Sequence, residues 1–217
     1  MITKGSSFQL LPEEIVSGLP VVTVKRNTVF IPLDKQEKIR LYYILEGEVE
    51  CFSIAFNGRR FVVDRSQAGD FVGKFSQMRS KDFKCGVRAL SDLKLIDFTE
   101  KAQELFSRYP DFHIAFLKET SDRVYGMYKI ALLNSQFSYE EILAYWLLKK
   151  QNHQHVVTNM DDAFRHMFIS ERHEYNLLKS FRKKGLIDST RGRRNIKLSD
   201  PEALRDLAWN IFTFMDE

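Results

Sequence analysis

The residues best suited to chemistry lie on one predicted helix in the C-terminal third. Ser170 can cap a helix from Glu171 to Lys184, and Gly185 suits the position just after its end. The outer face carries four polar side chains at spacings of four, three and four, so they project in one direction: Arg172, Asn176, Lys179 and Lys183. Arginine can donate two hydrogen bonds to guanine, asparagine can pair with adenine, and lysine contacts phosphates. The pattern predicts a recognition helix, 171–184, in the major groove of DNA.

Two neighbouring residues extend the base-contacting surface at the N-terminal end of this predicted helix. Glu171 can accept a hydrogen bond from cytosine, and His173 can reach a base or a phosphate. The alternative for each of these polar residues is that it is only a solvated surface side chain. We nevertheless expect Arg172 and Asn176 to carry most of the sequence preference.

A second basic element follows the helix. Residues 186–188 and 195–198 favour short strands, which makes 188–195 a wing whose tip carries three arginines: Arg191, Arg193 and Arg194. Between 179 and 197 eight basic residues face one acid, Asp188. A basic run can be no more than a solvated surface, but a phosphate backbone is the partner that it suggests.

Three further helices must position these elements. An apolar stripe indicates a helix over 139–147, and a second helix begins near Met160 with Thr158 or Asn159 as its cap. Asp200 and Pro201 suit the start of one last helix, whose apolar stripe is Leu204, Leu207, Ala208 and Ile211.

The N-terminal half has a different pattern, with brief apolar runs separated by turn residues. The predicted strands cover 21–24, 28–31, 41–45, 49–54, 60–63, 71–72, 87–90 and 93–98. Asn57-Gly58 is the strongest hairpin signal, because a type I′ turn needs positive φ at both central residues. Short strands at this spacing predict a sandwich or a barrel.

One long helix, predicted over 110–134, connects the two halves. Along it six residues follow alternating steps of three and four, which is the seam of a two-stranded coiled coil: Ile114, Leu117, Ser121, Val124, Tyr128 and Ala131. Ser121 is polar and Gly126 lies within the helix. Packing against the chain's own β-domain is therefore an alternative to dimerisation.

Composition excludes several classes of protein. A chain of 217 residues that is 44% apolar and 29% charged, with a net charge of +4, can build two folded domains. It shows no signal-peptide pattern and no apolar run of membrane-spanning length, so we expect a cytoplasmic protein without a membrane partner. Cys51 and Cys85 are distant in sequence and indicate neither a disulfide framework nor a metal knuckle.

Enzyme motifs are missing as well. No nucleophile-elbow, P-loop or dinucleotide-binding phrase occurs, so the chain is predicted not to be an enzyme. His153 and His155 could suggest a metal pair, but they lack a further ligand, and two surface histidines are the simpler interpretation. No metal site is predicted.

The order of these parts resembles the catabolite-activator/fumarate-nitrate-reduction (Crp/Fnr) family of bacterial transcription regulators. The phrases that carry the resemblance are Leu41 to Val49, Gly69 to Gly73, Val87 to Leu90 and Lys183 to Ile187. It implies an α+β fold with an N-terminal cyclic-nucleotide-binding-like β-roll (double-stranded β-helix) at 1–109, a dimerisation helix at 110–135 and a winged helix-turn-helix at 136–217. It also implies a homodimer on a near-palindromic double-stranded operator, and it admits RNA polymerase as a partner.

Some departures from the family pattern concern the residues that would bind a regulatory ligand or cofactor. Lys74 occupies the position of the glutamate that holds the ribose in cyclic-nucleotide-binding members, and Phe83 falls about where the phosphate-binding arginine should be. Two isolated cysteines cannot hold an iron–sulfur cluster. No cofactor is therefore implied. An unidentified small effector remains an open alternative to an empty scaffold, with a candidate pocket at Gly69, Phe71, Gly73, Lys74 and Phe75.

The recognition helix departs too. The family usually begins this helix with Ser-Arg-Glu, whereas here the order is Ser170-Glu171-Arg172, so we expect a different operator. Phe168 replaces the usual turn glycine, and Glu174 stands where a buried aliphatic residue is expected. The alternative class is therefore a ligand-binding or protein-interaction module whose helix-turn-helix no longer reads DNA.

Overall fold

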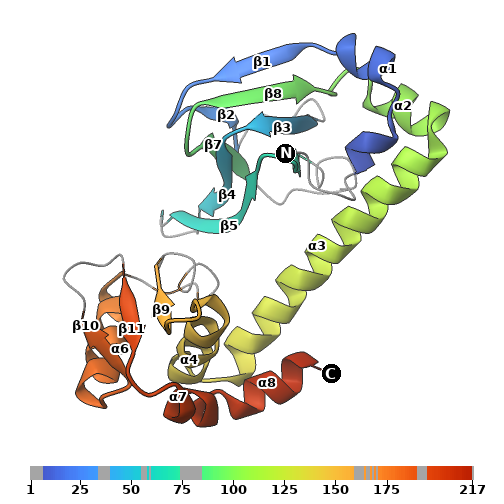
Figure 1. Ribbon diagram of the computed structural model, residues 1–217. Coiled ribbons are helices and arrows are strands. Elements are labelled where there is room, and N and C mark those ends of the chain that lie inside the picture. Colours follow the sequence, from blue (N-terminus) through green and yellow to red (C-terminus); the bar gives the residue numbers. More distant parts are fainter. Residues whose placement is uncertain are drawn as a thin grey trace. The chain divides into compact units, whose positions relative to one another are not determined.

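The computed structural model describes residues 7–33, 40–54, 58, 60–73, 85–158, 164, 167, 169, 171–189 and 195–216. The chain divides into two compact units, residues 1–124 and 125–217. The boundary falls inside one long helix, α3 (Pro110–Gln136), which begins in the first unit and ends in the second (Figure 1). Within the described residues, no helix is both long and apolar enough to cross a membrane.

The N-terminal unit is built on two four-stranded antiparallel sheets. One sheet has the order β1 (Val21–Val24), β8 (Leu93–Asp97), β3 (Tyr42–Glu46) and β6 (Phe71–Val72). The other has the order β2 (Val29–Ile31), β7 (Gly86–Ala89), β4 (Glu48–Ile54) and β5 (Arg60–Gln67). Since the chain passes from one sheet to the other at every connection except the β4–β5 hairpin, the unit is the predicted β-roll.

Alternation along each strand fills the space between the sheets. Val49 and Cys51 of β4 point into a core that Ile44, Val87 and Leu95 share, because successive residues of a strand face opposite sides. The pairing of β4 with β5 confirms the predicted hairpin. Of its turn, Gly58 has φ of +78° as such a turn requires, whereas Asn57 lies outside the described residues.

A second core of aromatic rings lies beneath α3. The helices η1 (Ser7–Leu10), α1 (Glu13–Ser17) and α2 (Ala102–Arg108) surround it. Phe71 is almost fully buried there, and its ring lies 5.2 Å from that of Phe98 and 5.3 Å from that of Phe116 on α3. Edge-to-face contacts of this kind favour one fixed arrangement of rings. They fix the first half of α3 against the β-roll.

The C-terminal unit packs helices against a small sheet. Its elements are α4 (Tyr139–Lys150), β9 (Val156–Val157), α6 (Glu171–Lys183), β10 (Ile187–Ser189), β11 (Ile196–Leu198), α7 (Pro201–Leu207) and α8 (Trp209–Asp216). The sheet order is β10-β11-β9. Leu143 and Leu147 of α4 and Phe181 of α6 are fully buried in the common core.

Three details of this unit correct the predictions. The predicted two-stranded wing gains a third strand, because Val157 pairs with Ile196. The predicted single last helix is two helices, α7 and α8, that are separated at Ala208. α4 is buried on most of its surface rather than along one stripe, since Ala144, Tyr145 and Leu148 are buried as well. The predicted helix near Met160 lies largely outside the described residues.

Candidate nucleic-acid interface

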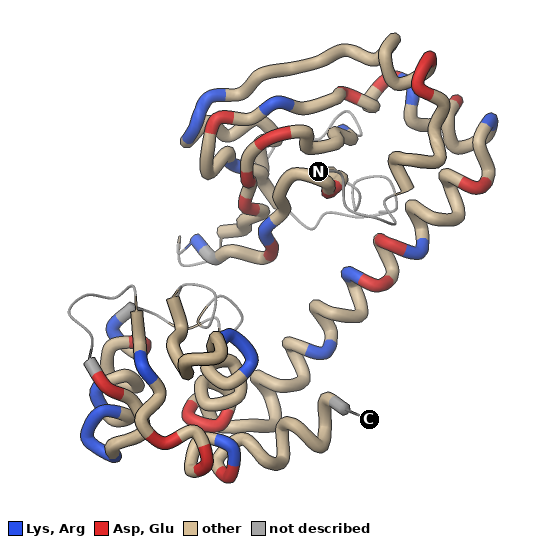
Figure 2. The backbone as a smooth tube through the Cα atoms, viewed as in Figure 1, with Lys and Arg blue, Asp and Glu red and all other residues tan. Residues whose placement is uncertain are grey.

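The outer face of α6 carries the predicted base-reading residues. Arg172, Asn176, Lys179 and Lys183 are all exposed. At 3.6 residues per turn they lie within about 60° of one another around the helix axis. Figure 2 shows Lys and Arg gathered along α6 and the segment that follows it. The helix thus presents one cationic, hydrogen-bonding face to the exterior.

The inner face holds α6 in place. Leu177 and Leu178 are buried, and Phe181 is completely buried in the core of the C-terminal unit. The helix ends at Gly185, whose φ of +73° is unfavourable for residues with a side chain. There the Gly185 N–H donates to the Arg182 carbonyl at 3.0 Å and the Leu186 N–H to the Phe181 carbonyl at 3.0 Å. This Schellman arrangement stops the helix as predicted.

A third side of α6 faces the start of α4. The Ser180 hydroxyl donates to one Glu140 carboxylate oxygen at 2.9 Å, and the Lys184 ammonium donates to the other at 2.6 Å. The hydrogen bond from Lys184 lowers the pKa of the Glu140 carboxyl below its usual value, against a smaller desolvation effect. The His173 ring lies edge-on to Tyr139, with ring centroids 4.9 Å apart. His173 is therefore turned toward α4 and away from the outer face.

Two exposed residues beside the outer face were left out of the predicted contacts, although Arg182 was counted in the basic run. The Tyr175 side chain is 57% exposed, and Arg182 is also exposed. Tyr175 comes three residues after Arg172 and four before Lys179, so helical spacing alone would have found it. An aromatic ring here can pack on a sugar or a thymine methyl group. Glu174, by contrast, is half-buried near the apolar side.

The wing is described only at its base. Asp188 pairs with Lys197 across β10 and β11, and Lys197 is exposed. Ser170, Arg191, Arg193 and Arg194 lie outside the described residues, and of Glu171 only the backbone is described. The strands place the wing directly after α6, since Ile187 begins β10 two residues beyond Gly185.

Only part of the predicted effector pocket lies within the described residues. Gly69 and Gly73 have φ of +98° and +89°, as turn glycines do, and a Cβ on Gly73 would lie 2.1 Å from the Arg40 carbonyl oxygen. Phe71 points into the aromatic core. Lys74 and Phe75 lie outside the described residues, as does Phe83.

The predicted dimer seam is exposed on α3. Ile114 is 66% exposed and Tyr128 is 59% exposed, whereas Phe112 and Phe116 on the opposite side are buried. Val124, Ser121 and Ala131 are exposed and Leu117 is half-buried. The seam residues are thus not the ones that pack against the β-roll, and Tyr125, which is 60% exposed, widens the apolar stripe.

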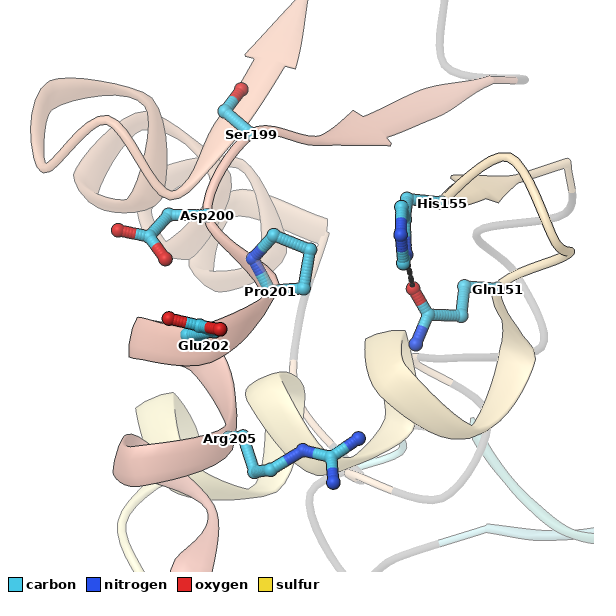
Figure 3. Close-up of a pocket in the computed structure, with 7 residues that line it drawn as sticks. All are labelled: Gln151, His155, Ser199, Asp200, Pro201, Glu202 and Arg205. Atoms are coloured by element: carbon cyan, nitrogen blue, oxygen red, sulfur yellow. Dashed lines mark hydrogen bonds between the residues drawn. The ribbon is translucent and has the colours of Figure 1, made fainter.

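A cavity of about 550 Å³ opens between the end of α4 and the start of α7 (Figure 3). His155 and Gln151 line one side, and the His155 Nδ1 lies 2.7 Å from the Gln151 amide oxygen. Asp200, Glu202 and Arg205 line the other. No group of three or more His, Cys, Asp or Glu side chains suited to a metal ion occurs within the part of the chain that the structure describes.

Comparisons with known proteins agree with this architecture. Residues 21–109 match the family model of the cyclic nucleotide-binding domain. No curated protein matches the sequence. A solved CooA mutant from Carboxydothermus hydrogenoformans has a TM-score of 0.71 and 14% identity, with 96% of this chain and 97% of that chain covered.

Two further solved structures show the same likeness. The CLP regulator of Xanthomonas campestris, described as c-di-GMP responsive, has a TM-score of 0.68 and 18% identity over 89% of this chain and 98% of that one. A Crp/Fnr-family regulator from Thermus thermophilus has a TM-score of 0.62 and 17% identity over 88% and 98%.

Residues 21–109 of the N-terminal unit therefore resemble the cyclic nucleotide-binding domain. The chain as a whole has the fold of the Crp/Fnr transcriptional regulators, and the predicted resemblance to that family is confirmed.

Proposed function

We propose that this protein is a homodimeric, sequence-specific DNA-binding transcription regulator. Helix 171–184 lies in the major groove, and the wing 188–195 contacts the DNA backbone. The observation that carries the proposal is the division of α6 into an exposed face with Arg172, Asn176, Lys179 and Lys183 and an opposite face that is buried around Phe181. A helix held this firmly offers its outer side chains to a partner without reorganisation.

The chemistry of the face fits duplex DNA. The major groove is wide enough for a helix, and base edges there distinguish all four base pairs. Arg172 and Asn176 are near the N-terminal end of α6, where a recognition helix meets bases, and Lys179 and Lys183 lie further along, where it meets phosphates. The order Glu171-Arg172 and the presence of Asn176 support an operator that differs from the family's common one.

The exposed stripe on α3 supports the homodimer. Ile114, Val124 and Tyr128 follow the coiled-coil spacing and leave an apolar strip, interrupted by Ser121, uncovered in a single chain. A second copy with the same strip would bury it through a two-fold interface, which doubles the number of DNA contacts on a near-palindromic operator.

Further partners belong to the same proposal. A regulator of this kind acts in the bacterial cytoplasm, where the DNA lies, and RNA polymerase is a partner of activators among them. A small effector in the β-roll near Gly69 and Gly73 would supply the signal, and no enzymatic activity is proposed.

Binding-site selection from random duplexes tests the function. The wild-type protein should enrich a near-palindrome with half-sites about one helical turn apart, and Arg172→Ala and Asn176→Ala should each relax the preference at one position per half-site. Lys25→Ala, at an exposed site of the N-terminal unit, is the matched control and should leave the motif unchanged. If no motif were enriched at any salt concentration, the interaction-module alternative would replace the proposal.

A further inference from the structure

The chain's two cysteines, distant in sequence, lie side by side inside the β-roll. β4 and β7 pair with Cys51 opposite Val87 and Phe52 opposite Gly86. One step further along this ladder places Cys85 opposite Ser53, so Cys51 and Cys85 are diagonal neighbours on the same face of the sheet. Neither cysteine is in a disulfide, and the two thiols are close enough for Cys85 to raise the pKa of Cys51. Sequence spacing could not show this contact, because strand pairing creates it.

The thiol pair adjoins an ion pair that anchors α3. Asp64 of β5 is the direct partner of Cys51 across the β4–β5 ladder, which has a bulge immediately after Cys51. The Arg123 guanidinium of α3 donates to the Asp64 carboxylate at 2.5 Å and to the Ser66 hydroxyl at 2.8 Å. It also bonds the Arg65 carbonyl oxygen. The Arg123 side chain is only 19% exposed, so the anchor is largely shielded from water.

Charge couples the two clusters. The hydrogen bond with Cys85 and burial raise the pKa of the Cys51 thiol, while Asp64 raises it further and Arg123 opposes this effect. Burial acts to lower the pKa of Arg123, but Asp64, Asp70 and Cys51 together raise it. A change in the chemical state of Cys51 therefore acts directly on the contact that holds α3 to β5.

We propose that Cys51 and Cys85 form a reversible dithiol–disulfide switch that signals oxidation to α3. The oxidant is a hydroperoxide. The Cys85 sulfur attacks the peroxide, whose O–O bond breaks, so that Cys85 becomes a sulfenic acid and one alcohol or water leaves. The Cys51 sulfur then displaces hydroxide from the sulfenic acid, and water forms as the S–S bond closes. Two thiols and one hydroperoxide thus give one disulfide, one water and one alcohol or second water, and a small thiol reverses the step by exchange.

The order of attack follows from the surroundings of Cys51. Because Cys51 retains its proton more strongly than an ordinary cysteine, it is the poorer initial nucleophile and the resolving partner. Gly86, directly after Cys85, has the backbone freedom that a local shift needs, although its own face is packed against the Phe52 ring.

Closing the bond must move backbone. The Cβ atoms of diagonal neighbours in a sheet lie roughly 6–7 Å apart, whereas a disulfide requires about 4 Å. Oxidation therefore draws the start of β7 toward β4 by about 2 Å, next to the bulge and opposite Asp64. Because Asp64 is the cross-strand partner of Cys51, we expect this shift to alter the Asp64–Arg123 contact.

The chemical test does not depend on DNA. The purified full-length protein is titrated with hydrogen peroxide, and the thiols are counted and the intact mass measured under non-denaturing conditions. We expect both thiols to be lost together, with a mass change of two hydrogen atoms in a monomeric polypeptide and a Cys51–Cys85 cross-linked peptide, all reversed by dithiothreitol. Cys51→Ser should instead accumulate a dimedone-reactive sulfenic acid at Cys85. The proposal would be overturned if the sole products were intermolecular disulfides, or if the thiols were oxidised one after the other to sulfinic acid.

The signalling step rests on the proposed DNA-binding function. Reduced and oxidised protein should differ about fivefold or more in DNA affinity, the smallest effect usual for coupled sites. The Cys51→Ser, Cys85→Ser double variant should bind like the reduced protein in both conditions, and Arg123→Met, which removes the anchor, should abolish the difference while the disulfide still forms. If the disulfide forms but the reduced and oxidised proteins bind DNA with equal affinity, the switch is overturned. If neither the wild type nor any variant binds DNA, the proposed function is overturned and the disulfide measurement still stands.

Discussion

The salt dependence of DNA binding tests which face of α6 meets the phosphates. Lys179 and Lys183 are exposed on the outer face, and each would neutralise one phosphate per half-site. Each phosphate contact contributes about 0.9 to the slope of log affinity against log salt, so removing two lysines from both protomers should reduce the slope by about 3.6. Between 50 and 200 mM salt, the affinity of Lys179→Ala, Lys183→Ala should therefore fall roughly a hundredfold less than that of the wild type.

The assay is fluorescence anisotropy with one selected duplex across a salt series. Lys184→Ala is the matched control, because Lys184 is on the same helix but binds Glu140 on the α4 side at 2.6 Å. Its slope should stay within about one phosphate contact of the wild type. An equal reduction for Lys184→Ala, or an unchanged slope for the double variant, would refute the assignment of the outer face.

Three other predictions concern the supporting structure. Ile114→Glu with Tyr128→Glu should give monomers in analytical ultracentrifugation, because charges would replace the exposed apolar stripe, whereas Asp122→Ala, off the stripe, should stay dimeric. Gly185→Ala should reduce the free energy of unfolding by about 1 kcal/mol from backbone strain alone, since a Cβ there would meet no atom within 4 Å; a neutral result in denaturant titration would contradict this. The pKa of Glu140 is lowered in the folded state, so its contribution is present at neutral pH and is lost as pH falls below about 4. Glu140→Gln should accordingly cost up to about 1 kcal/mol at pH 7 and nothing at pH 3, and a loss equal at both values would show that the ion pair is not the cause.

Local patterns predicted most of the described fold. The strand at 21–24 and the two-residue strand at 71–72 were found with their observed bounds, because apolar runs between turn residues mark them. α3 and α6 were predicted to within two residues from spacing, a proline and a helix-ending glycine. The break at Ala208 was missed, because the apolar stripe from Leu204 to Ile211 continues through it and both ends are fully buried.

Contacts made by distant segments could not be predicted. The Cys51–Cys85 contact depends on the register of β4 and β7, and the Glu140 contacts depend on how α6 crosses α4. His173 was assigned to DNA from its helix position, yet it lies against Tyr139, which belongs to another helix. The sequence therefore identified the exposed outer face of α6 but not the residues of α4 that hold this helix in position.

The end of α3 lies only a few residues in the chain before Glu140, whose contacts hold α6. α3 ends at Gln136, Ser138 caps α4 through a reciprocal bond with Glu141, and Glu140 in the same turn binds Ser180 and Lys184. The last turn of α3 and the recognition helix thus share one short rigid link within the C-terminal unit. An added residue between Gln136 and Ser138 should change how α4 and α6 are oriented on the last turn of α3 while leaving each helix folded. For a regulator of the kind proposed, the length of this joint would then matter more than the strength of any single contact.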